Sequence, residues 1–137
     1  MDLMELLFSN HVQKFYAAAR IITGFLFLSH GAQKLFNAFG GQGTYGKALL
    51  LFAGIIEFFG GAFFILGLKA RYAAFIMAVE MLYAYFTVHQ PKGVWPIQNG
   101  GELALLYFCI FLISIANGAG NWSLDALLKK GRSLKFK

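Results

Sequence analysis

The stretch that decides the fold is residues 15–36, which read FYAAARIITGFLFLSHGAQKLF. It is long and apolar enough to cross a bilayer as a helix, yet it contains Arg20, His30 and Lys34. Each ionisable side chain at bilayer depth costs about 2.5–3.5 kcal/mol on insertion scales. These three side chains therefore require partners, which we expect on the other apolar segments of the chain.

Composition indicates lipid rather than water as the solvent. Hydrophobic residues make up 58% of the 137 residues and charged residues only 13%, too few to cover a globule in water. Cys109 is the single cysteine, which excludes an intrachain disulfide. The net charge of +6 does not indicate nucleic acid, because the basic residues form no patch beside stackable aromatics on a soluble domain. Much of the excess lies in the tail, at Lys129, Lys130, Arg132, Lys135 and Lys137.

The apolar segments are separated by residues that end helices. Glycines follow the first segment, and Pro91 and Pro96 lie in the loop after the third. The predicted fold class is therefore all-α, a membrane four-helix bundle in a domain covering residues 15–120. Each expected span suits a hydrocarbon core about 30 Å thick. The expected spans are residues 15–36, 46–68, 72–89 and 100–117.

Both ends of the chain are predicted to lie on the cytoplasmic side. Residues 1–14 form a short lead-in, and residues 121–137 form a basic tail with Ser123 as the expected N-cap of a short amphipathic helix near anionic headgroups. The positive charges near the span ends gather mostly on this side, as in cytoplasmic loops. Asp2 and Glu5 argue against a cleavable signal peptide. We therefore expect a multi-pass integral membrane protein.

Charges of both signs occur at membrane depth. A rise of about 1.5 Å per residue gives the depth of each side chain from its position in a span. Arg20 then lies in the inner half, Lys34 and Glu102 lie toward the outer face, and Glu57 and Glu80 lie near mid-depth. The near-balance of charge favours inward-facing pairs, Lys34 with Glu102 and Arg20 with Glu57 or Glu80.

An outer polar cluster is expected at the level of Lys34. His30 precedes Lys34 by four residues on the same helix, and His89, Asn99 and Glu102 lie at a similar depth. Intramembrane ionisable residues indicate a functional site, although buried pairs can also do no more than fix helix register. A haem between His30 and His89, or a zinc ion held with Glu102, is conceivable, but no ligand motif supports either.

Short motifs of glycine and charged residues follow one another along nearly the whole chain. They are Arg20-x3-Gly24-x5-His30-Gly31-x2-Lys34, Glu57-x2-Gly60-Gly61, Gly67-Leu68-x2-Arg71, Glu102-Leu103-Ala104 and Gly118-x-Gly120-x2-Ser123-Leu124-Asp125. In this order and spacing, over residues 15–126, the chain resembles the DoxX family of small four-helix membrane proteins.

The resemblance implies a subunit of a quinone-linked membrane redox system in the bacterial inner membrane. The family takes its name from a membrane subunit of a thiosulfate:quinone oxidoreductase, so a quinone is the cofactor to expect, whereas no haem or metal motif is evident. His30 and Glu102 would then exchange protons, as general acid–base groups do. The remaining candidate residues are Lys34, Glu57, Glu80, His89 and Asn99 for ligand binding and Arg20 for a structural ion pair.

Two other functions stay open. The protein can be a non-enzymatic anchor or assembly partner of a larger complex, in which the charges only specify register. A small-molecule permease is less favoured, because the chain shows no inverted repeat or broken helix. In each case we expect contact with the lipid bilayer and with a membrane or periplasmic partner protein, compatible with a homo-oligomer and without nucleic acid.

Overall fold

The computed structural model describes residues 2–41, 43 and 47–135, which form helices and connecting turns without a strand. The all-helical class is therefore confirmed. The predicted start of the second span at residue 46 lies outside the described residues, as do residues 136–137 of the tail. The helices are α1 (Leu3–Phe8), η1 (Ser9–His11), α2 (Val12–Phe36), η2 (Ala38–Gly40), α3 (Ala48–Leu66), α4 (Ala70–Ala84), η3 (Tyr85–His89), η4 (Gln90–Lys92), α5 (Pro96–Asn99), α6 (Glu102–Asn117) and α7 (Leu124–Lys135).

Two of the described segments are long and apolar enough to cross a membrane. They are Ala48–Leu66, with 19 residues, and Ala70–Lys92, with 23 residues, in which α4 continues through the π turn η3 and the 3-10 turn η4. The second reaches three residues beyond its predicted end at residue 89. Helix α2 has 25 residues but includes Arg20, His30 and Lys34, and α6 is apolar but has only 16 residues.

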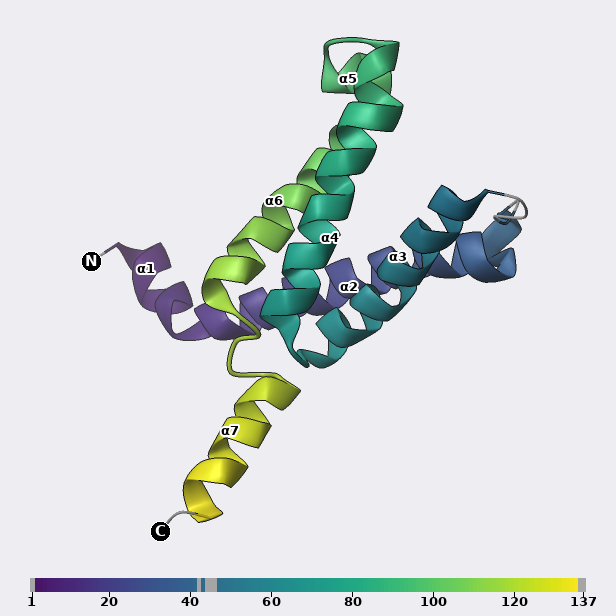
Figure 1. Ribbon diagram of the computed structural model, residues 1–137. Helices are drawn as coiled ribbons and strands as arrows, with labels where there is room; N and C mark the ends of the chain where they lie inside the picture. Colours follow the sequence, from purple (N-terminus) through teal and green to yellow (C-terminus); the bar gives the residue numbers. More distant parts are fainter. Residues whose placement is uncertain (1, 42, 44–46, 136–137) are drawn as a thin grey trace.

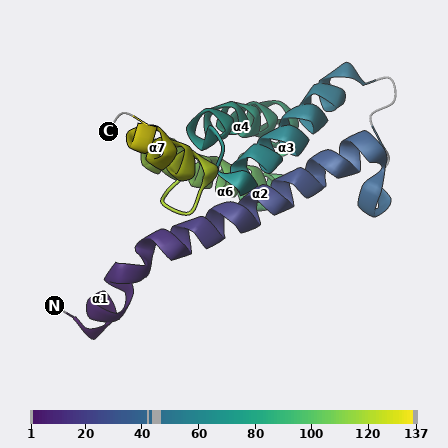
Figure 2. The same cartoon turned by 90° about the horizontal axis from the view of Figure 1, so that it is seen from below.

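The long helices pack as two antiparallel pairs. Figure 1 shows α2 beside α3 and α4 beside α6, and the two pairs diverge from the end of the molecule where α3 turns into α4. Contacts between α3 and α4 join the pairs. Helix α7 leaves the same end and points away from both pairs, as Figure 1 shows; Figure 2 shows this end from below.

The contact between α2 and α3 depends on glycine. A Cβ atom on Gly31 would lie 2.3 Å from the backbone nitrogen of Phe58, and one on Gly61 would lie 2.6 Å from that of Leu28. Neither distance leaves room for a methyl group, so the two backbones touch directly. Helices in lipid associate through such small residues, because lipid tails leave no hydrophobic driving force between them.

The core at the crossing of the two pairs is aromatic. Phe27 of α2, Phe64 of α3 and Phe111 of α6 are fully buried, and Met77 of α4 is buried in the same cluster. The ring centroids of Phe27 and Phe64 lie 5.0 Å and 5.4 Å from that of Phe111, both in edge-to-face geometry. This cluster fixes the crossing point, from which the pairs diverge.

We predict that Gly31→Ala destabilises the protein by about 1–3 kcal/mol, because the added methyl group meets the backbone of Phe58 and overpacks the helix contact. The measurement is the thermal unfolding midpoint of the purified protein in detergent. The control is Gly131→Ala in α7, where a Cβ atom meets nothing within 4 Å. An unchanged midpoint for Gly31→Ala would show that the helices are not in backbone contact.

Candidate functional site: a polar-centred cavity between the helix pairs

A cavity of about 680 Å³ lies where the two helix pairs diverge. Its wall comes from α2, α3, α4, η3, α6 and the turn before α6. Most of the lining is apolar, including Phe27, Ile56, Val79 and Leu103. The ionisable residues that line it are His30, Lys34, Glu57, Glu80 and His89.

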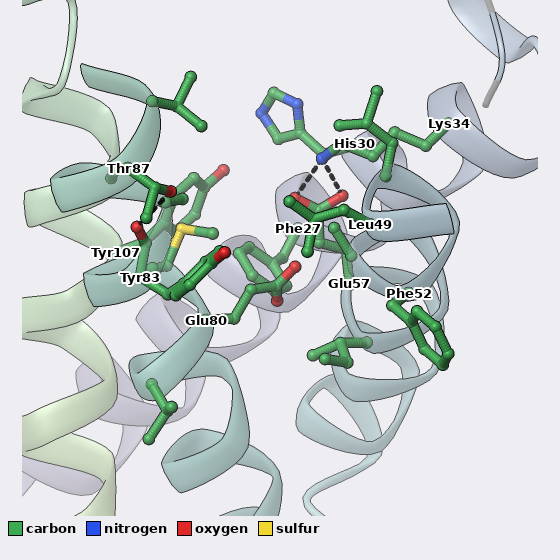
Figure 3. Close-up of a pocket in the computed structure, with 18 of the residues that line it drawn as sticks. Phe27, His30, Lys34, Leu49, Phe52, Glu57, Glu80, Tyr83, Thr87 and Tyr107 are labelled. Atoms are coloured by element: carbon green, nitrogen blue, oxygen red, sulfur yellow. Dashed lines mark hydrogen bonds and ion pairs between the residues drawn. The ribbon is translucent and has the colours of Figure 1, made fainter. Parts of the chain in front are cut away.

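Lys34 and Glu57 form an ion pair at the centre of the cavity. The Lys34 ammonium donates to both carboxylate oxygens of Glu57, as Figure 3 shows. Lys34 lies in the last turn of α2 and Glu57 in the middle of α3, and the antiparallel glycine contact brings the two together. Glu57 is 4% exposed, so its charge depends on this partner.

The expected pair of Lys34 with Glu102 is wrong. Glu102 is exposed in the first turn of α6 and does not line the cavity. Leu103, Ala104 and Tyr107 are the residues of α6 that face it. Glu102 lies on another side of α6 from the residues that face the cavity.

Glu80 is the second carboxylate of the cavity. It lies in the middle of α4, and both of its carboxylate oxygens are buried without a hydrogen-bond partner among the described residues. In Figure 3 its side chain points from α4 into the space beside Glu57. Two carboxylates therefore face one ammonium group, and a buried polar group without a partner costs about 1–3 kcal/mol.

His30 stands beside Lys34 at the edge of the cavity. Its ring is half-buried and lies edge-on to that of Tyr107, with centroids 6.2 Å apart and an interplanar angle of 89°. Tyr83 of α4 and Thr87 of η3 also line the cavity. Sequence reasoning did not single out Thr87 and Tyr107, although Thr87 follows Glu80 by seven residues and so lies on its helix face.

His89 lines the cavity, whereas Asn99 makes hydrogen bonds within the loop that precedes α6. The Nδ1 atom of His89 lies 3.2 Å from the carbonyl oxygen of Asn99. The Asn99 side chain donates to the carbonyl of Gly93 over 2.8 Å and accepts from the N–H of Gly101 over 2.7 Å. Within the described residues, no three His, Cys, Asp or Glu side chains are grouped so that they could hold a metal ion.

Arg20 lies at the opposite end of α2 and takes no part in the cavity. The predicted ion pair with Glu57 or Glu80 is wrong. Both carboxylates lie in the cavity with Lys34, and Arg20 precedes Lys34 by four turns of helix, about 21 Å. It is 1% exposed and donates to the carbonyls of Phe64, Ile65 and Trp122, over 2.8 Å to Ile65 and 2.7 Å to Trp122. Arg20 therefore has a structural role, because it joins α2 to the end of α3 and to the segment before α7.

Fold and cavity together define an all-helical integral membrane protein with an ionisable centre inside an apolar wall. The chain belongs to the DoxX family, whose family model matches residues 15–90. It is 48% identical over 127 residues to an uncharacterized protein of Haemophilus influenzae, covering 85% of this chain and 95% of that protein. It is 31% identical over 131 residues to an uncharacterized membrane protein of Mycobacterium tuberculosis, covering 81% and 79% of the two chains. No solved structure matches the chain.

We predict that Lys34→Met and Glu57→Gln are coupled. Lys34→Met leaves Glu57 buried without its partner and destabilises the protein by about 3 kcal/mol, the lower end for broken buried pairs because the Lys34 side chain is 27% exposed. The double variant loses less than the sum of the two single losses. Thermal unfolding midpoints in detergent measure all three variants. Strict additivity would show that the pair contributes no coupling energy.

Proposed function

We propose that this protein binds a lipophilic quinone in the cavity and serves a quinone-linked redox system of the bacterial inner membrane. The observation that carries the proposal is the combination of an apolar wall with four ionisable lining residues, Lys34, Glu57, Glu80 and His30. A volume of about 680 Å³ falls within the range of small-molecule sites, which are mostly apolar with few polar groups.

The lining residues fit the chemistry of a quinone head group. A quinone ring is flat and apolar and carries carbonyl oxygens that accept hydrogen bonds. Lys34 and the hydroxyls of Tyr83 and Tyr107 are donors within the wall. Phe52 and Phe75 line the cavity and are also exposed on the surface of the helices, which gives an apolar ligand a path in from the bilayer.

Each ionisable residue has a proposed part in binding. Lys34, held by Glu57, orients a ligand carbonyl through a charge-assisted hydrogen bond. His30 and Glu80 exchange protons with the ligand oxygens, His30 because its unperturbed titration lies near neutral pH and Glu80 because its carboxylate has no partner. When bound, a quinone supplies reversible two-electron chemistry, and electrons reach it from a partner protein in the membrane or periplasm.

The proposal includes a topology. We propose that α2, α3, the continuous segment Ala70–Lys92 and α6 each cross the membrane, with both chain ends in the cytoplasm. The support is charge: Lys14, Lys69, Arg71 and the basic tail lie at one end, against Lys47 and Lys92 at the other. This places the opening between the helix pairs toward the outer face.

We predict that the purified protein in detergent binds a short-chain ubiquinone, measured by titration calorimetry, and that Ala53→Phe weakens binding about ten-fold or more. Ala53 lines the cavity, so the phenyl ring occupies ligand space. The matched control, Ala18→Phe, adds the same ring to an exposed position of α2 and leaves the affinity unchanged. A folded wild-type protein that binds no quinone would contradict the proposal and favour the assembly role.

We predict that Glu80→Gln reduces the number of protons exchanged on binding, because an amide keeps the size of the side chain but does not titrate. The heat of quinone binding in two buffers of different ionisation enthalpy gives that number. Glu102→Gln is expected to leave it unchanged, since Glu102 is exposed outside the cavity. The reverse result would restore Glu102 to the site and remove Glu80 from it.

A further inference from the structure

A second hollow, of about 770 Å³, lies at the end of the molecule opposite the cavity. It forms where α3 turns into α4 and where α6 leads into α7, the end shown from below in Figure 2. Its cationic lining residues are Lys69 and Arg71 at the start of α4 and Lys129 in α7, all three exposed. Asp125 is the acidic residue of the lining.

Three cations and one carboxylate line this hollow, so the carboxylate offsets only part of the positive charge. The carboxylate of Asp125 accepts from the backbone N–H of Lys69 over 2.9 Å and from that of Ala70 over 3.2 Å, and so it caps the start of α4. Arg71 uses Nη2 to donate to the carbonyl of Ala116 over 3.2 Å. Among the described residues, no ion pair involves Lys69, Arg71 or Lys129.

The frame of the hollow is fixed by hydrogen bonds between distant segments. Arg20 of α2 donates to the carbonyl of Trp122, and the N–H of Asp125 donates to the carbonyl of Gly67 over 3.0 Å. Ser123 caps α7 by accepting from the N–H of Ala126 over 3.2 Å. The first turn of α7 is therefore attached to the helix pairs, and Lys129 follows one turn later at a set place.

The surface beside the cations is apolar and aromatic. Tyr72 is 72% exposed and Trp122 62% exposed, and Leu127 and Leu128 of α7 are exposed as well. Tyrosine and tryptophan prefer the headgroup level of a membrane, where a polar tip and an apolar body both find contacts. A soluble anion makes no apolar contact with such a surface, whereas the acyl chains of a phospholipid can pack against it.

We propose that this hollow binds the phosphate group of an anionic phospholipid, with Lys69, Arg71 and Lys129 around the phosphate and the leucines of α7 against the acyl chains. Basic pockets at the ends of membrane helices bind anionic headgroups in this way, and each nearby cation contributes about 1 kcal/mol. The site is independent of the quinone proposal, because it lies at the other end of the molecule and shares no lining residue with the cavity.

The test is lipid binding by the full-length protein in neutral detergent, measured by native mass spectrometry and by the shift of the unfolding midpoint. The probes are phosphatidylglycerol, phosphatidylcholine and inorganic phosphate. We expect tighter binding of phosphatidylglycerol than of phosphatidylcholine and no stabilisation by inorganic phosphate. The double variant Lys69→Gln/Lys129→Gln should weaken phosphatidylglycerol binding about five-fold per charge removed.

The matched control is Lys47→Gln/Lys92→Gln, which removes the same charge from exposed positions at the opposite end. It is expected to keep wild-type affinity. Equal weakening by the control, unchanged binding by Lys69→Gln/Lys129→Gln, or equal stabilisation by inorganic phosphate would each overturn the assignment. If the Lys69 change impairs folding, the single variant Lys129→Gln on the exposed surface of α7 carries the test, with Lys92→Gln as its control.

Discussion

The ion pair of Lys34 and Glu57 is the interaction on which the cavity depends. A charge inside an apolar layer needs a partner at hydrogen-bond distance, because the surrounding dielectric screens little and the cost of desolvation is large. That distance is reached only because Gly31 and Gly61 let the backbones of α2 and α3 touch. The glycine contact and the ion pair therefore both join α2 to α3, and α4 and α6 complete the wall of the cavity.

The two cations of α2 have different partners. Arg20 therefore has a structural role, whereas Lys34 belongs to the candidate site. Arg20 presents a fork of donors to the last turn of α3, where backbone carbonyls lack partners within the helix and the helix dipole is negative. No titratable partner is needed there, so the role of Arg20 itself is structural. Lys34 has a single compact charge and takes a carboxylate, which leaves titratable groups facing a space that a ligand can enter.

The sequence was sufficient for the all-helical fold class and for the membrane setting. Composition indicated the membrane setting, and the glycines and prolines between the apolar segments indicated where helices end. The sequence did not give the rotation of each helix about its own axis, because the position of a residue in a span gives its expected depth but not the direction of its side chain. Lys34 pairs with Glu57 and not with the expected Glu102, which lies on an exposed side of α6. Tyr107 was missed because uncharged aromatics are abundant in this chain.

The charges of the cavity constrain what can occupy it. Lys34 neutralises Glu57, and Glu80 is left with no partner. In an apolar enclosure an ionised Glu80 needs a donor from the ligand, and a protonated Glu80 has a donor to offer. A ligand that only accepts, or only donates, satisfies one of these states. A group that exchanges carbonyl for hydroxyl, as a quinone does on reduction, satisfies both, and this match of protonation states supports a quinone over a permeating anion.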